Sequence, residues 1–144
     1  MTIDRSFVER NRAATRRIRE MTRLTDAELL TPVGGHWTVA VLLAHLALWD
    51  LRVLFDLEKS LQEGKLFVHQ ADIYVNDYAL PLLSAVPPRE AARLAVEAAE
   101  ALDRLLETLP AELFEEVYAN NRRFVERWQH RGEHLDEAEK ALQR

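Results

Sequence analysis

The sequence has no cysteine among its 144 residues, and it has little glycine or proline. Without cysteine the chain can form no disulfide, offers no thiolate to a metal and has no cysteine nucleophile. Any sulfur chemistry would therefore depend on a cosubstrate. Only four glycines and five prolines are present, too few for the many turns of a β-sheet protein. Alanine, leucine, glutamate and arginine dominate instead, and these residues favour helix.

Long apolar runs are also missing. The longest lies between Val39 and Trp49, is interrupted by His45, and is too short to cross a bilayer. The N-terminal residues lead directly into charged side chains, so no secretory signal is visible. We therefore expect a cytoplasmic protein that does not bind membranes.

An overall excess of basic charge is missing, because 24 acidic residues outnumber 19 basic ones, the net charge is −5 and the pI is about 5.6. The first 24 residues depart from this balance, with seven arginines against three acidic residues. A basic helix can contact nucleic acid, but no aromatic platform is interleaved with these arginines. We interpret them as the solvated face of a bundle helix and expect no nucleic-acid partner. The absence of a phosphate-binding glycine loop, a nucleotide-binding fingerprint and a Ser-His-Asp ordering excludes kinases, Rossmann enzymes and classical serine hydrolases.

Helical periodicity predicts four long helices in a single domain over residues 1–144. The predicted helices span residues 4–22, 38–63, 87–109 and 121–142, and a short capped helical turn is expected at 24–30. Thr38 is a natural N-cap for the second helix, Gly64 stops it, and Pro110 breaks the third. These elements favour an all-α four-helix bundle.

The segment between the second and third helices, residues 64–87, is far longer than a connection between antiparallel neighbours. It contains an amphipathic piece of its own at 71–80. A long crossover lets the second and third helices run parallel, which predicts the order up, down, down, up. The second helix is then antiparallel to the fourth.

Three histidines are the candidate functional residues. His130 and His134 are four residues apart, so their imidazoles share one helix face. Alone, such a pair is more often a solvated polar face than a metal site. His45 lies in the second helix, and the antiparallel pairing places it and His134 at similar depth, roughly 10–12 Å from one end of the bundle. The three imidazoles can converge in this topology, whereas parallel pairing would misalign them.

The order of short motifs resembles the DinB/YfiT-like superfamily over nearly the whole chain. The motifs are Trp37-Thr38, His45-Leu46, Asn76 in the crossover, and His130-Arg131-Gly132-Glu133-His134-Leu135. The resemblance implies an up-down-down-up bundle with the metal ligands His45, His130 and His134. Characterised members include thiol S-transferases and mycothiol-dependent maleylpyruvate isomerase. No substrate-binding motif carries over.

A three-histidine ligand set suits zinc or nickel, with iron(II) as an alternative, and it leaves coordination positions open. An ion in such a site lowers the pKa of a bound water or thiol. The leading hypothesis is therefore a metal-dependent enzyme that activates a low-molecular-weight thiol or water for transfer to a small electrophile. The alternative is a non-catalytic, stress-associated bundle protein that binds a metal or a ligand.

Four residues near the triad are candidates for lining a substrate pocket, namely His36, Trp49, Trp128 and Arg131. Arg131 falls within the apolar seam of the fourth helix. It could hold an anionic group of a substrate or thiol, although snorkelling to the end of the bundle is the commoner behaviour. His36 precedes the second helix in a glycine-rich loop, where a solvated histidine is commoner than a site residue.

Other polar residues near the ligands receive weaker interpretations. By helical spacing, Asp50 and Glu133 are expected to project away from the ligand face, so neither is a convincing general base. His69 receives no role. Gly132 inside a helix costs about 1 kcal/mol relative to alanine, which indicates either close backbone packing or simple tolerance.

The crossover carries more apolar side chains than a simple loop needs. They are Ile73, Tyr74, Leu80, Leu82 and Leu83. We predict that they support self-association as a homodimer, with closure over the protein's own core as the alternative.

Overall fold

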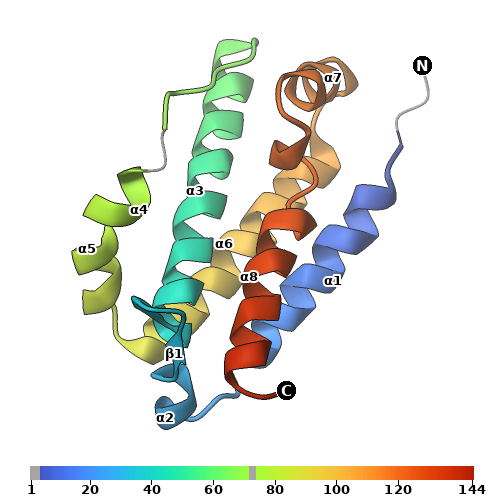
Figure 1. Ribbon diagram of the computed structural model, residues 1–144. Coiled ribbons are helices and arrows are strands. Elements are labelled where there is room, and N and C mark those ends of the chain that lie inside the picture. The colour runs from blue at the N-terminus through green and yellow to red at the C-terminus, as the bar shows by residue number, and fades with distance from the viewer. Residues whose placement is uncertain (1–3, 72–73) are drawn as a thin grey trace.

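The computed structural model describes residues 4–71 and 74–144 and is mostly helical (Figure 1). The helices are α1 (Ser6–Met21), α2 (Asp26–Leu29), α3 (Val39–Glu63), α4 (Tyr74–Tyr78), α5 (Leu80–Ala85), α6 (Pro88–Thr108), α7 (Ala111–Asn120) and α8 (Trp128–Ala141), with a 3₁₀ turn, η1, at Arg122–Phe124. Two short strands, β1 (Pro32–Val33) and β2 (Trp37–Thr38), form an antiparallel hairpin before α3. Helices α1, α3, α6 and α8 pack together as a bundle.

Hydrogen bonds between helices fix their directions. When two helices are antiparallel, residues further along one helix bond to residues earlier in the other. When two helices are parallel, the residue numbers of the bonded partners increase together. The bonded pairs are Arg12–Glu107 and Thr15–Asp103 (α1 and α6), Asn11–Trp128 and Arg17–Asp136 (α1 and α8), and His45–His134 and Asp50–Arg127 (α3 and α8). The order is therefore up, down, down, up, with α3 and α6 parallel, and Figure 1 shows the same directions.

Helix α3 occupies the centre and begins and ends where the sequence predicts. The Thr38 hydroxyl accepts a hydrogen bond from the Val41 N–H at 3.1 Å, which caps the N-terminus. Gly64 ends the helix in the left-handed region at φ 71°, where a residue without Cβ is unstrained. The first nine residues of α3 are all buried, which places His45 in the interior.

The interior consists of two apolar clusters with buried polar groups between them. The lower cluster includes Ile18, Leu42 and Leu135, and the upper one includes Phe7 and Leu106. The intervening buried polar residues are Asn11, Thr15, His45, Asp50, Asp103, Arg127 and Arg131. The candidate site therefore lies within the bundle at its middle.

The predicted fourth helix over 121–142 is wrong at its start. Residues 111–120 form a separate helix, α7, which was not predicted, and α8 begins only at Trp128. Asn121 adopts an extended conformation that ends α7, and its side chain caps η1 by accepting from the Arg123 N–H at 3.0 Å. The buried Asn11 side chain, on α1, donates to the Val125 carbonyl and accepts from the Trp128 N–H. A residue of another helix therefore sets where α8 begins.

The crossover contains two short helices, α4 and α5, where a single amphipathic piece over 71–80 was expected. Of the residues named for the homodimer, Ile73 lies outside the described residues. Leu83 packs against the lower apolar cluster, while Leu82 is 74% exposed. The homodimer remains a prediction.

None of the helices in the described ranges is long and apolar enough to cross a membrane.

Candidate metal centre

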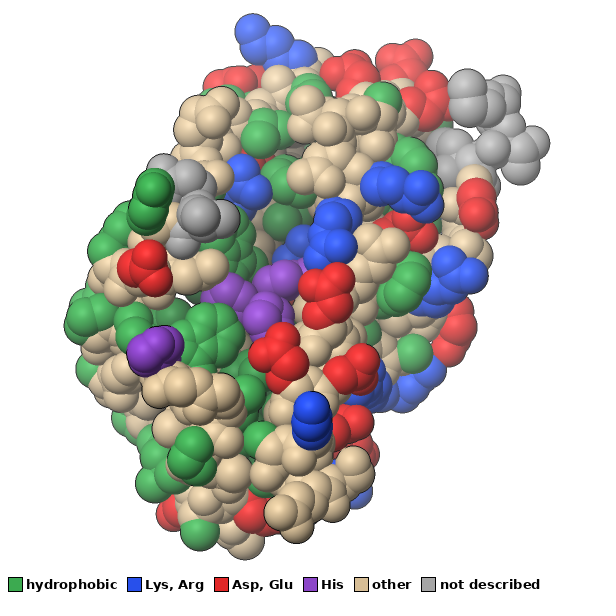
Figure 2. Space-filling model, viewed as in Figure 1, with side chains coloured by type: hydrophobic (Ala, Val, Ile, Leu, Met, Phe, Trp, Pro, Cys, Tyr) green, Lys and Arg blue, Asp and Glu red, His purple; other side chains and the backbone are tan. Residues whose placement is uncertain are grey.

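Three histidines from two helices meet in the middle of the bundle. His45 on α3 is 2% exposed, and its Nε2 lies 3.3 Å from Nε2 of His130 and 3.2 Å from Nε2 of His134, both on α8. One nitrogen from each ring lies within 4.8 Å of the others. Figure 2 shows histidine side chains gathered in a hollow at the centre of one face, with basic side chains next to them.

The spacing of these nitrogens fits a shared ion. Two ligands of a tetrahedral ion with bonds of 2.0–2.1 Å are about 3.3–3.4 Å apart, and His45 has both partners at nearly this separation. A donor set of neutral imidazoles suits a divalent cation of the zinc or nickel type. The residues therefore fit a metal, although the arrangement does not identify which one.

Burial favours the neutral, ligating form of the histidines. Loss of hydration lowers the pKa of His45 to about 3, with repulsion from His134 and Arg127 acting in the same direction. The pKa of His130 falls to about 2, mainly through burial and then through Arg127. Burial also lowers the pKa of His134, while Glu137 and Glu133 oppose that shift.

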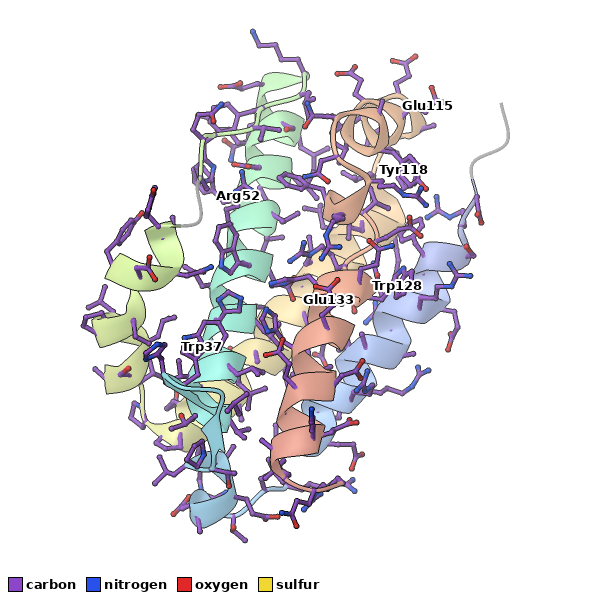
Figure 3. The ribbon with its side chains drawn as sticks, in the orientation of Figure 1. Trp37, Arg52, Glu115, Tyr118, Trp128 and Glu133 are labelled. Carbon is purple, nitrogen blue, oxygen red and sulfur yellow. The ribbon has the colours of Figure 1, made fainter. Side chains whose placement is uncertain are left out.

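The hairpin before α3 supplies an aromatic residue, Trp37, whose contact with the histidines was not predicted from the sequence. The Trp37 ring centroid lies 4.6 Å from that of His45 and 5.7 Å from that of His134. Pairing of Val33 with Trp37 holds the indole there. In Figure 3 the Trp37 side chain points toward the centre of the bundle. The crossover also reaches the site, because Trp49 Nε1 donates to the Asn76 side-chain oxygen at 2.8 Å.

The outward nitrogens of the three rings have different surroundings. Nδ1 of His45 and Nδ1 of His134 are both buried without a hydrogen-bond partner in the described chain, although a Glu137 carboxylate oxygen lies 3.3 Å from the His134 atom. Nδ1 of His130 lies 3.3 Å from Nη2 of Arg127. A guanidinium can only donate, so this contact is a hydrogen bond only when Nδ1 of His130 carries no proton.

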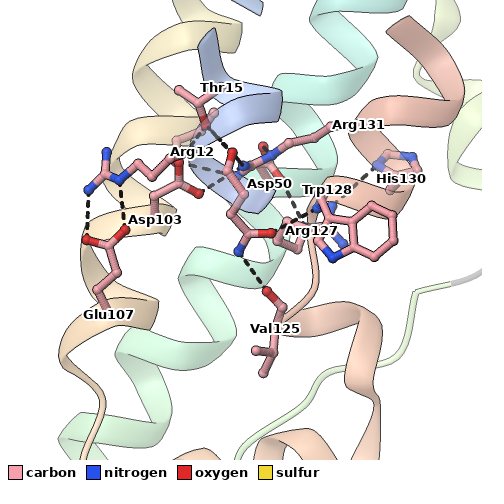
Figure 4. A network of polar contacts seen from close by, with 12 residues as sticks. Arg12, Thr15, Asp50, Asp103, Glu107, Val125, Arg127, Trp128, His130 and Arg131 are labelled. Atoms are coloured by element: carbon pink, nitrogen blue, oxygen red, sulfur yellow. Dashed lines mark hydrogen bonds and ion pairs between the residues drawn. The ribbon is translucent and has the colours of Figure 1, made fainter. Parts of the chain in front are cut away.

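Arg131 does not snorkel to the end of the bundle but is enclosed within it. It is 0% exposed, donates to Asp50 at 2.9 Å and to Asp103 at 2.8 Å, and also contacts Thr15 (Figure 4). The expectation that it reaches the end of the bundle is wrong, because two buried carboxylates hold it in the polar layer between the apolar clusters.

Asp50 is likewise an interior residue. One carboxylate oxygen accepts from Arg131 and the other from Arg127, each at 2.9 Å. Because Arg127 also contacts His130, Asp50 positions one of the three imidazoles through a neighbour. Sequence spacing alone could not reveal this, since the partners are about 80 residues away in the chain.

The remaining candidates are separated by the fold. Trp49 lines a cavity together with His130, whereas Trp128 lines a different hollow of about 680 Å³ between α1 and α8. His36 is exposed in the turn between β1 and β2 and makes no hydrogen bond with the triad in the described ranges. Glu133 is exposed and bonds to Arg123, away from the ligands as expected.

The fold and the site define a helical bundle with a three-histidine cluster that could hold a divalent metal. The profile of the DinB superfamily matches residues 8–141, so this chain belongs to the DinB superfamily. Comparison with curated proteins and with solved structures found no match.

Proposed function

We propose that this protein is a metal-dependent enzyme in which His45, His130 and His134 hold a divalent cation. Zinc and nickel are the preferred ions. The observation that carries the proposal is the convergence of three ring nitrogens at 3.2–3.3 Å around His45. When bound, such an ion lowers the pKa of a coordinated thiol or water toward neutrality.

The reaction we propose joins a low-molecular-weight thiol to a small electrophile. The thiol loses its proton to solvent, and its sulfur adds to one carbon of an activated C=C bond. The π bond breaks as the C–S bond forms, and the neighbouring carbon takes up a proton from solvent. The sulfur must come from a cosubstrate because the chain has no cysteine. The carboxylates near the ligands support thiol rather than water as the nucleophile. Asp50 is bound to two arginines, Glu133 is bound to Arg123, and Glu137 faces the outward nitrogen of His134.

The chain's own residues supply positioning and water exclusion. The Trp37 ring packs against His45 and His134, while the Trp49 ring lies edge-on to His45 at a centroid separation of 6.3 Å. The cavity beside His130 provides room for a reactant, which favours an enzyme over a purely binding protein.

The test is metal-dependent conjugation by purified protein. Zinc- or nickel-loaded protein is assayed with a panel of small thiols and an electrophilic chromophore, together with His130→Gln and the exposed-site control His36→Gln. Conjugation by the wild type and His36→Gln, but not by His130→Gln, supports the proposal. Metal-dependent hydrolysis of an ester or amide without conjugation would show that water, not a thiol, is the nucleophile. The absence of both metal-dependent activities would contradict the proposal.

A further inference from the structure

A small cavity opens between α3 and the segment that leads into α8. Its volume is about 130 Å³, room for about four water molecules. Three of its lining residues are arginines, Arg52 from α3 and Arg123 and Arg127 from the approach to α8, and His130 lines it as well. A molecule in this cavity would touch one ligand of the proposed metal and be surrounded by guanidinium groups.

Arg52 is incompletely paired within the protein. Its Nη2 donates to the His69 carbonyl at 3.0 Å, but its buried Nε has no hydrogen-bond acceptor in the described residues. The nearest carboxylate oxygen, on Asp56, is 3.9 Å away, and the other oxygen of that carboxylate contacts His69. The guanidinium stacks 4.9 Å from the centre of the Phe124 ring, which fixes its plane beside the cavity. The Arg52 side chain as a whole is 18% exposed, and its buried Nε is a donor without an acceptor, which favours an added anion.

Arg127 and His130 give a second reason, which applies when the proposed metal is bound. A histidine that ligates a metal through Nε2 carries its proton on Nδ1, so the Arg127 donor 3.3 Å away would then face another donor. An anion in the cavity could accept from both groups. Ligating histidines commonly donate their second N–H to a carboxylate, and no carboxylate of the described chain contacts Nδ1 of His130.

We infer that this cavity is the binding site for a carboxylate group of the small organic reactant, held by Arg52, Arg123 and Arg127 beside His130. The inference rests on the proposed function for its setting, because it names the class of molecule that the metal site would act on. The sequence suggested that Arg131 could hold an anionic group. We assign that role to these three arginines instead, because they line a cavity whereas Arg131 is fully enclosed.

The lining favours a small organic carboxylate over an inorganic anion. Trp49 and Phe124 provide aromatic surface for a short carbon chain next to the arginines, and guanidinium groups match the planar carboxylate. The carboxylate could belong to the thiol or to the electrophile, and both have the same recognition chemistry.

Binding to metal-free protein tests the inference without relying on catalysis. NMR titration compares 3-mercaptopropionate with 3-mercaptopropionamide, and acrylate with acrylamide, so that each pair differs in the carboxylate alone. We expect at least one acid to bind about tenfold more tightly than its amide, the effect of charged hydrogen bonds. The pair with the larger preference identifies whether the thiol or the electrophile carries the carboxylate. Equal binding of acid and amide in both pairs would overturn the inference.

Matched variants localise the effect. Arg52→Gln should abolish the acid preference, whereas Arg104→Gln, on the exposed face of α6, should retain it. If Arg52→Gln fails to fold, the exposed Arg123→Gln serves instead and should reduce the preference. An acid preference that is as large in the folded variant as in the wild type rules out the cavity as its source. Acid binding without metal-dependent turnover would leave the carboxylate site standing and defeat the proposed function alone.

Discussion

At the scale of single residues, Asp50 is the group that connects the candidate metal centre to the rest of the bundle. Its two oxygens accept hydrogen bonds from Arg127 and Arg131. Arg131 also donates to Asp103 and Thr15, which lie on two other helices. Two carboxylates thereby balance two guanidinium groups inside the bundle. Such a network holds side chains in fixed positions because removal of one member leaves an uncompensated buried charge.

Replacement of Asp50 by Asn should lower the free energy of unfolding by about 3–5 kcal/mol, because Arg127 and Arg131 would lose a shared counter-charge in the interior. Urea denaturation measures the change. Asp136→Asn is the matched control, since Asp136 is exposed and pairs with Arg17 at the surface, where the loss should stay below about 1 kcal/mol. Equal effects of the two substitutions would show that the Asp50 network does not stabilise the fold.

The sequence predicts the three histidines but not their surroundings. His130 and His134 are visible from local spacing, and His45 joins them once the crossover sets the helix directions. Arg131 was misjudged because its partner carboxylates come from α3 and α6, and their distance in sequence hides the pairing. Non-local ion pairs leave no periodic signal.

At the scale of elements, α8 carries two of the three ligands and depends on both local and distant contacts. Its start is set by Asn11 of α1, which bonds the Val125 carbonyl and the Trp128 N–H. The cap at Thr38 and the stop at Gly64 act within a few residues, and the sequence predicts both. The start of α8 depends on a side chain more than 110 residues away, so the predicted boundary was several residues too early.

Gly132→Ala should stabilise the protein by about 0.4–1 kcal/mol, because alanine is the better helix former and loses less entropy on folding. A Cβ at this position would meet only Nη1 of Arg17 at 3.8 Å, an ordinary contact. The close backbone packing considered from the sequence is therefore not required. Thermal or urea unfolding tests the gain, and a destabilisation above about 1 kcal/mol would mean that the backbone near His130 and His134 tolerates no added atom.

At the scale of the whole molecule, a polar layer separates two apolar clusters. The lower cluster includes Leu43 and Leu135, the upper one includes Leu57 and Phe114, and the histidines lie near the boundary. Each cluster holds its own end of the bundle, which leaves the middle for ionisable groups. Burial of these groups makes the stability of the metal-free protein depend on pH.

The free energy of unfolding of the metal-free protein should fall as the pH is lowered below about 6.5. In the folded state the pKa of His45 is about 3 and that of His130 about 2, so the unfolded chain takes up protons that the folded chain does not. Stability from this source is present above pH 6.5 and is lost on acidification. Urea titrations from pH 7.5 to 5 measure the slope, which should be smaller in His130→Gln by at most about 1.4 kcal/mol per pH unit. An unchanged slope would contradict the burial of a neutral imidazole at this position.

Metal stoichiometry is the most direct test of the central claim that His45, His130 and His134 form one metal site. The purified protein is loaded with zinc or nickel and dialysed, and its metal content per chain is measured by inductively coupled plasma mass spectrometry. The variants His45→Gln, His134→Gln and His36→Gln are treated in the same way. We predict about one ion per chain in the wild type and in His36→Gln, and almost none in the two ligand variants, all of which should remain helical by circular dichroism. Wild-type protein that retains neither metal, or a His45→Gln variant that retains as much as the wild type, would contradict the account.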